Sequence, residues 1–161
     1  MTTETDDAVA LLRLQGRYAD VVTRRAWDEL SELFLPDTEI LLDTVTATPR
    51  LLAGPEEFGR FVAGAVERFD YFAFVVLNSV VDVDGPDVAG GRMFMCEIRH
   101  EAGAPADATG SWHNAYGVYQ DRYRRVDGRW WFAERRYRSM ARTGPEPAVF
   151  GLPPDMERDD L

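Results

Sequence analysis

Few side chains in this sequence can exchange protons near neutral pH. The chain has two histidines, His100 and His113, and one cysteine, Cys96. Cys96 and His100 lie four residues apart in a segment typical of a strand, so they share a face but stand about 13 Å apart, too far for a nucleophile and its base. His113 is therefore the best candidate for acid–base catalysis in this pH range.

An asparagine interrupts the apolar segment 71–83. In a strand, alternation places Asn78 on the same face as Phe72 and Phe74. A buried amide needs hydrogen-bond partners, because desolvation without them is unfavourable. We expect Asn78 to bind a ligand carbonyl in a pocket lined by Phe74, with a backbone hydrogen bond at a bulge as the alternative.

Tyr18 and Arg136 are further candidates for a pocket. Tyr18 belongs to an apolar helical stripe, where its hydroxyl is either a general acid toward a substrate oxygen or a core group bonded to the backbone. Arg136 lies in the segment 122–142, which contains eight arginines and two acidic residues. The segment is either a solvated hairpin or a subunit interface. A sharper hypothesis is that Arg136 holds a carboxylate or enolate, with Glu97 as its partner across the sheet.

Composition excludes several classes of function. The 161 residues have a net charge of −10, which disfavours binding to nucleic-acid phosphates. All 18 basic residues are arginine, so chemistry that needs a lysine amine, such as Schiff-base formation or anchoring of pyridoxal phosphate, is excluded. Two histidines on different strands and one cysteine do not make a zinc site, and nucleotide-binding motifs are missing from the sequence. We therefore expect neither a metal nor a cofactor.

The expected location follows from similar features. A single cysteine indicates a reducing compartment. The acidic start does not resemble a signal peptide, and apolar runs stay short of the roughly 20 residues that cross a bilayer. We expect a soluble cytoplasmic protein with no membrane partner.

The elements that hold the candidate residues in place follow from the hydrophobic pattern. Helical spacing of apolar residues predicts helices over 6–25, with Thr5 as cap, over 27–34 and over 55–69. Segments rich in β-branched and aromatic residues predict strands over 38–43, 71–83, 87–101, 111–126 and 129–142. The segment 44–54 is expected to be a loop.

The order of these elements predicts the architecture. Helices followed by antiparallel strands indicate an α+β fold. The long strands greatly exceed the usual ~5–6 residues, and internal glycines such as Gly117 indicate bulges and strong curvature. We expect a cone-shaped antiparallel sheet packed on three N-terminal helices, with a pocket at its open end. One domain is expected over 1–142, followed by an extended proline-rich tail over 143–161.

Several short motifs follow one another in a defined order between residues 6 and 142. They are Tyr18, Trp27-Asp28-Glu29-Leu30, Phe34 with Pro36-Asp37, Gly54, Phe58, VDVDG at 81–85 and YxDRYRRVDGRW at 119–130. Together they resemble the SnoaL-like branch of the nuclear-transport-factor-2-like superfamily. This resemblance implies a cystatin-like α+β barrel with a pocket between helices and sheet, as in polyketide cyclases, scytalone dehydratase and ketosteroid isomerase.

The resemblance also implies positions for a catalytic site. Dehydratase relatives use an aspartate on the first helix and two strand histidines, and these positions correspond here to Thr23, Phe74 and Tyr116. All three residues differ from that pattern. The base of the isomerase relatives falls on Leu42, so using the neighbouring Asp43 would require a shift of one residue.

The resemblance further implies which face of segment 111–126 is concave. It places Tyr116 inside the pocket together with Asn114 and Trp112. His113 then points outward or toward a subunit contact, unless a bulge at Gly117 reverses the strand.

These observations predict a cofactor-free isomerase, dehydratase or cyclase that acts on an apolar, cyclic, oxygenated small molecule. The alternative is a non-catalytic binding or subunit protein, like the small subunit of ring-hydroxylating dioxygenases. A third possibility is a pocket closed by the tail around Phe150 and Leu152. The adjacent Trp130 and Trp131 point to opposite faces of a strand, which predicts a covered outer face and most simply a homodimer.

Overall fold

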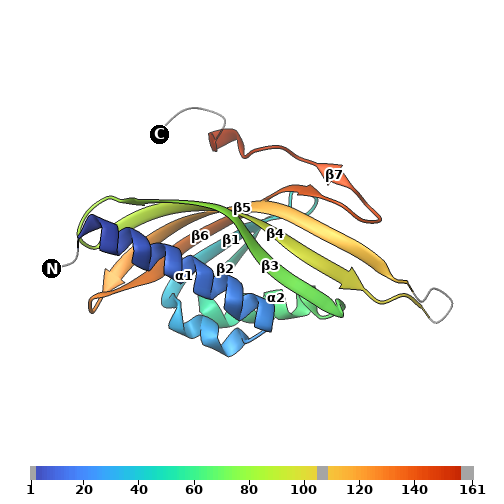
Figure 1. Cartoon of the computed structure of the whole chain (residues 1–161), viewed down its shortest axis with the longest axis horizontal. Coiled ribbons are helices and arrows are strands. Elements are labelled where there is room, and N and C mark those ends of the chain that lie inside the picture. Colours follow the sequence, from blue (N-terminus) through green and yellow to red (C-terminus); the bar gives the residue numbers. More distant parts are fainter. Residues whose placement is uncertain (1–2, 105–108, 157–161) are drawn as a thin grey trace.

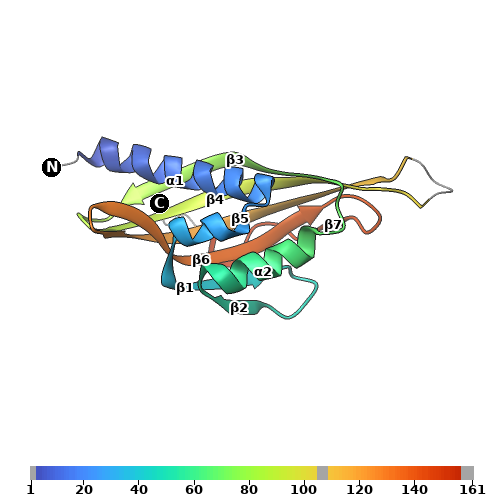
Figure 2. The same ribbon diagram turned by 90° about the horizontal axis from the view of Figure 1, so that it is seen from below.

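The protein is described by a computed structural model over residues 3–104 and 109–156. Three helices at the start of the chain pack on one face of the sheet, which we call the inner face (Figures 1 and 2). They are α1 (Glu4–Arg24), the 3₁₀ helix η1 (Trp27–Glu32) and α2 (Gly54–Val66). Among the described residues, none of the helices has the length and apolar character needed to span a membrane.

The described residues form one sheet of seven strands. Its strands are β1 (Phe34–Asp43), β2 (Arg50–Ala53), β3 (Tyr71–Val83), β4 (Val88–Glu101), β5 (Ser111–Val126), β6 (Arg129–Arg142) and β7 (Ala148–Val149). Their order is β2-β1-β6-β5-β4-β3, with β7 paired to β6. Neighbours are antiparallel except β1 and β6, which are parallel. The predicted α+β fold, a curved sheet on three N-terminal helices, is confirmed.

The ends of several elements differ from those expected from the sequence. Helix α1 begins earlier, because Thr3 rather than Thr5 is its cap: the Thr3 hydroxyl accepts from the Asp6 N–H at 3.1 Å and the Asp6 carboxylate from the Thr3 N–H at 2.9 Å. Strand β1 includes Pro36, which lies where the pairing with β6 is irregular and a backbone N–H is not required. Strand β2 lies in the segment expected to be a loop.

The C-terminal segment is more structured than an extended tail. It contains strand β7 and a short 3₁₀ helix, η2 (Pro154–Met156). In Figure 1 the end of this segment lies on the side of the sheet opposite the helices, which we call the outer face, whereas Phe150 lines a cavity on the inner face. The Gln120 side-chain amide donates to the Asp155 carboxylate at 3.2 Å there.

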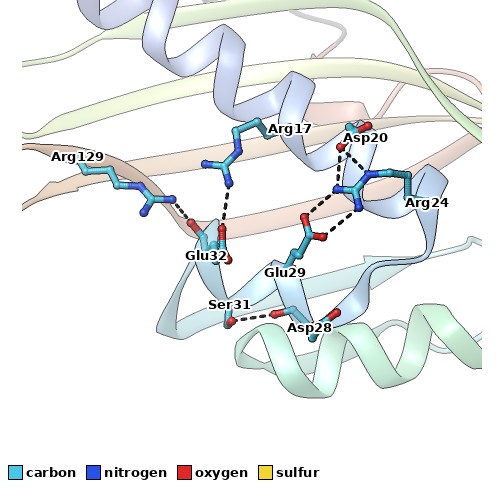
Figure 3. Close-up of polar contacts among 8 residues, drawn as sticks. All are labelled: Arg17, Asp20, Arg24, Asp28, Glu29, Ser31, Glu32 and Arg129. Atoms are coloured by element: carbon cyan, nitrogen blue, oxygen red, sulfur yellow. Dashed lines mark hydrogen bonds and ion pairs between the residues drawn. The ribbon is translucent and has the colours of Figure 1, made fainter.

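Exposed ion pairs fix the turn from α1 into η1 (Figure 3). The Arg24 guanidinium donates twice to the Glu29 carboxylate, at 3.0 and 2.7 Å, and once to Asp20 at 2.9 Å. Arg17 contacts Glu32 at 3.2 Å. Pairs of this kind contribute little to stability in water; they link η1 to α1 just before β1 begins.

A bulge in β3 changes which of its residues face the helices. Phe74 lies opposite Glu97 and Val76 opposite Met95, but the register then shifts and Asn78 lies opposite Phe94. The extra residue, Leu77, breaks the alternation and turns Asn78 to the outer face, where it is exposed.

A second bulge has the same effect in β6. Arg122 pairs with Glu134, but Tyr123 pairs with Phe132, so Ala133 is the extra residue. Arg135 therefore faces the helices and is fully buried, whereas Arg136 lies on the outer face.

The inner face of β5 holds His113, Gly117 and Tyr119. The pairing of β4 with β5 runs without a shift, so alternation is unbroken through this stretch. The Tyr119 hydroxyl lies 3.3 Å from that of Tyr18 on α1, which identifies this face as the one toward the helices. The outer face therefore holds Trp112, Asn114 and Tyr116, which is opposite to the placement that the resemblance implies. The irregularity expected at Gly117 does occur, but the extra residue lies in the partner strand β6 and leaves the alternation of β5 intact.

His100 ties the segment after β4 to the start of β3. Its Nδ1 lies 2.7 Å from the Asp70 carboxylate and its Nε2 lies 3.1 Å from the Thr109 carbonyl oxygen. Both partners are hydrogen-bond acceptors, so the protonated ring satisfies both. The Thr109 carbonyl and then the Asp70 carboxylate raise the pKa of His100 above its ordinary value.

We expect the substitution Asp70→Asn to destabilise the protein more at about pH 5.5 than at about pH 9. Because the folded-state pKa of His100 is raised, its stabilisation is fully present below the unfolded-state pKa and is lost as pH rises through the folded-state pKa. Urea unfolding at the two pH values measures the difference. Asp20→Asn is the control, since its partner Arg24 stays charged at both; equal losses for Asp70→Asn at both pH values would contradict this role of His100.

Candidate functional site

A buried ion pair occupies the centre of the inner face. Arg135 donates to the Asp121 carboxylate from Nε at 2.7 Å and from Nη2 at 2.9 Å, and both side chains are 0% exposed. The rings of Tyr18, Tyr119 and Phe132 lie 4.1–4.2 Å from the guanidinium carbon. We call these five residues the arginine cage; they fill the middle of the molecule.

The cage keeps its cation charged. Burial opposes the charge on Arg135, but the Asp121 carboxylate outweighs this effect and holds the pKa of Arg135 above its ordinary value. Burial also raises the pKa of Tyr18 and of Tyr119, so both hydroxyls stay protonated.

A cavity of about 230 Å³ lies beside the cage, between α2 and the inner faces of β4, β5 and β6. Helix α2 contributes an apolar wall that includes Phe58, Phe61 and Val62. The sheet contributes the polar groups, which are Glu97, Arg99, Tyr119, Tyr137, Ser139 and Arg142. A cavity with apolar walls and a few polar groups is typical of a site for a small organic molecule.

Glu97 is the acidic residue of this cavity. Its side chain is 19% exposed, and its carboxylate lies 3.5 Å from the Arg99 guanidinium. Withdrawal from solvent raises the pKa of Glu97, and the charge of Arg99 offsets only part of this effect. A cavity carboxyl with a raised pKa is suited to accept and return protons in catalysis.

Tyr137 supplies a hydrogen-bond donor to the same cavity. Its hydroxyl lies 3.1 Å from the Ser139 hydroxyl, and its ring lies over Gly117, where a Cβ atom would overlap it. Burial and then the charge of Glu97 raise the pKa of Tyr137, so its phenol stays protonated. The cavity thus combines a proton acceptor, Glu97, with two phenol donors, Tyr119 and Tyr137.

Comparison with known proteins places this fold in a family. Residues 3–136 match the SnoaL-like domain. The chain belongs to the SnoaL-like family. Among curated proteins, none matches the sequence of this SnoaL-like protein.

Solved structures similar to this SnoaL-like protein share its fold. A scytalone dehydratase-like protein from Novosphingobium aromaticivorans is 21% identical, with a TM-score of 0.72 over 90% of this chain and 91% of that chain. The hexachlorocyclohexane dehydrochlorinase LinA-type3 from Novosphingobium barchaimii is 20% identical, with a TM-score of 0.70 over 90% and 94%. An aromatic ring hydroxylase-like protein from N. aromaticivorans is 19% identical, with a TM-score of 0.72 over 89% and 96%.

Thr23 and Phe74, the positions to which the sequence resemblance assigns an aspartate and a histidine, contact one another. The Thr23 hydroxyl on α1 accepts from the backbone N–H of Phe74 on β3 at 2.9 Å. Neither side chain can exchange a proton near neutral pH. This contact therefore offers no group for proton transfer, unlike the cavity that holds Glu97.

The sequence candidates on the inner face do not form one cluster. Tyr18 belongs to the arginine cage, and Phe74 packs edge-on against it with ring centroids 5.2 Å apart. His113 lies beyond the Glu97 cavity, where its Nε2 is 2.8 Å from the Ser111 hydroxyl and 3.2 Å from the Glu101 carboxylate.

The remaining candidates lie on the outer face or at the edge of the sheet. Asn78 is exposed, and Trp112 is 56% exposed beside His100. Arg136 donates to Glu134 at 3.0 Å on the surface, and Asp43 pairs with Arg138. Tyr116 and Asn114 share the outer face with Trp112.

Sequence reasoning passed over the polar groups of the cavity. Glu97 entered only as a partner for Arg136, and Tyr119 only as part of a motif. A usable signal was present, because Glu97 is the acidic residue in the apolar run MFMCEI at 93–98. No group of three histidine, cysteine, aspartate or glutamate side chains suited to a metal ion occurs within 3–104 and 109–156.

Proposed function

We propose that this SnoaL-like protein is a cofactor-independent isomerase or lyase acting on an apolar, oxygenated small molecule. The observation that carries the proposal is the Glu97 carboxyl group, which lies with a raised pKa in an apolar cavity that also holds the phenols of Tyr119 and Tyr137. The Glu97 carboxylate removes a proton from a carbon next to a carbonyl, and the electron pair moves onto the carbonyl oxygen. A phenol hydroxyl donates a hydrogen bond to the oxyanion that forms.

The second half of the reaction has two outcomes. Return of the proton from Glu97 to another carbon gives isomerisation, whereas loss of a hydroxide from the neighbouring carbon, with that proton, gives dehydration. The names of two similar structures, a scytalone dehydratase-like protein and a hexachlorocyclohexane dehydrochlorinase, denote eliminations of water and of hydrogen chloride. They support a lyase or isomerase class for this chain.

Exchange of hydrogen for solvent deuterium tests the proposed step without knowledge of the natural substrate. We expect the wild-type protein in D₂O to accelerate deuterium incorporation next to the carbonyl in at least one member of a panel of cyclic ketones and hydroxyketones, followed by proton NMR. The Glu97→Gln variant is expected to lose this acceleration. A panel in which wild-type protein and Glu97→Gln exchange equally overturns the proposal.

A second candidate function is binding without catalysis. It is favoured by the Thr23–Phe74 contact, which replaces the relatives' acid–base pair with a structural hydrogen bond. In that case ligands raise the thermal midpoint of the protein, since a bound ligand stabilises the folded state, while deuterium exchange stays at the rate without protein.

A further inference from the structure

Two arginines stand between the Glu97 cavity and a second hollow. Arg99 of β4 and Arg142 of β6 line the cavity, and both also line a hollow of about 370 Å³ whose other walls are polar except at Pro145. That hollow includes Arg68, His113 and Glu101. A ligand that fills the apolar cavity and reaches its polar end therefore meets both guanidinium groups.

Both guanidinium groups are held in place through Nε. Arg99 donates from Nε to the His113 carbonyl at 3.0 Å, and Arg142 donates from Nε to the Glu146 carbonyl at 2.7 Å. Arg99 also lies over the Phe69 ring, 5.0 Å from its centroid. Anchoring through Nε leaves the terminal nitrogens of each arginine for other partners.

The terminal nitrogens make only long contacts within the described residues. Arg99 Nη1 lies 3.5 Å from the Glu97 carboxylate, and Arg142 Nη2 lies 3.6 Å from that of Glu146, whose side chain is 85% exposed. Charge-assisted hydrogen bonds between such groups are typically about 2.7–2.9 Å long. A carboxylate placed between the two arginines would gain shorter hydrogen bonds than these ion pairs provide.

We propose that the cavity takes an amphipathic organic acid. Its apolar ring lies against Phe58, Phe61 and Val62, and its carboxylate binds Arg99 and Arg142. The planar guanidinium fork matches a carboxylate, and the two arginines supply the charge-assisted donors that it needs. The inference rests on the proposed function, since it names the substrate class of the same cavity.

A matched pair of ligands tests the inference. Isothermal titration calorimetry is carried out with 2-naphthoate and with 2-naphthamide, which have the same ring but differ in charge. We expect the wild-type protein to bind the acid at least about tenfold more tightly than the amide. Arg99→Gln and Arg142→Gln are each expected to lose this preference while keeping their affinity for the amide.

Arg136→Gln is the matched control, because Arg136 pairs with Glu134 on the outer surface; it is expected to keep the preference. Retained affinity for the amide shows that each variant still has a folded cavity. Equal affinities of wild-type protein for acid and amide, or a preference that survives in Arg99→Gln and Arg142→Gln, would overturn the inference. An acid preference without deuterium exchange refutes only the proposed catalysis, whereas exchange without an acid preference refutes only the carboxylate site.

Discussion

Replacing Asp121 with asparagine is expected to lower the free energy of unfolding by about 3–5 kcal/mol. The substitution leaves the Arg135 guanidinium without its counter-charge in a place where the side chain is 0% exposed. The rings of Tyr18, Tyr119 and Phe132 stabilise the cation, but they cannot replace a carboxylate that accepts two hydrogen bonds from it. Urea unfolding followed by circular dichroism measures the loss.

The double variant Asp121→Leu/Arg135→Met separates the ion pair from the packing around it. Because this variant replaces both charged side chains with apolar side chains of similar size, we expect it to be more stable than either single variant. Glu134→Gln breaks the exposed pair with Arg136 and is expected to cost less than about 1 kcal/mol. An Asp121→Asn variant as stable as Glu134→Gln would show that the cage contributes no more than a surface pair.

The elements of the fold were predictable because local patterns encode them. The long strands β3, β5 and β6 begin and end where their residue types predict, and the Asp127-Gly128 turn joins the last two. Strand β2 was missed because its four residues, Arg50–Ala53, have no alternating pattern and are held by pairing with β1. Short edge strands of this kind depend on tertiary contacts rather than on their own sequence.

The candidate site was less predictable, because single extra residues decide which face a side chain takes. Leu77 turns Asn78 outward, and Ala133 turns Arg135 inward in place of Arg136. Neither bulge is marked by a glycine. A prediction that assumes strict alternation through a bulge places every later residue of the strand on the wrong face of the sheet.

The resemblance predicted the family correctly, but the face that it assigns to Tyr116 is the opposite of the observed one. Family motifs such as Asp121 within YxDRY describe the buried centre of the fold, which SnoaL-like proteins of different function can share. The cavity that holds Glu97 and Tyr137 is lined by parts of β4 and β6 that lie outside those motifs. The residues of the candidate site therefore follow from the three-dimensional arrangement and not from the family motifs.

Replacing Glu97 with glutamine is expected to slow deuterium exchange by about 10²–10⁴-fold, the usual contribution of a general base. Glutamine keeps the size of the side chain and its contacts with the cavity wall, but it cannot take up the proton. With the wild-type protein, exchange is expected to rise with pH through a pKa above the ordinary Glu value of 4.5, since only the carboxylate is active. Glu134→Gln, on the outer face, is expected to leave the rate unchanged.

The same substitution is expected to stabilise the protein at neutral pH. Because the pKa of Glu97 is raised on folding, the folded state binds more protons than the unfolded state between the two pKa values, so stability falls as pH rises through that interval and stays lower above it. Glutamine resembles the protonated form at every pH and removes this loss. Urea unfolding should therefore show Glu97→Gln more stable than wild type at about pH 7 and not at about pH 4. A Glu97→Gln variant that is less active but equally destabilised at both pH values would indicate a structural role for Glu97. If Glu97 is instead an ionised base in an unfavourable cavity, its replacement lowers the activity and raises the stability together.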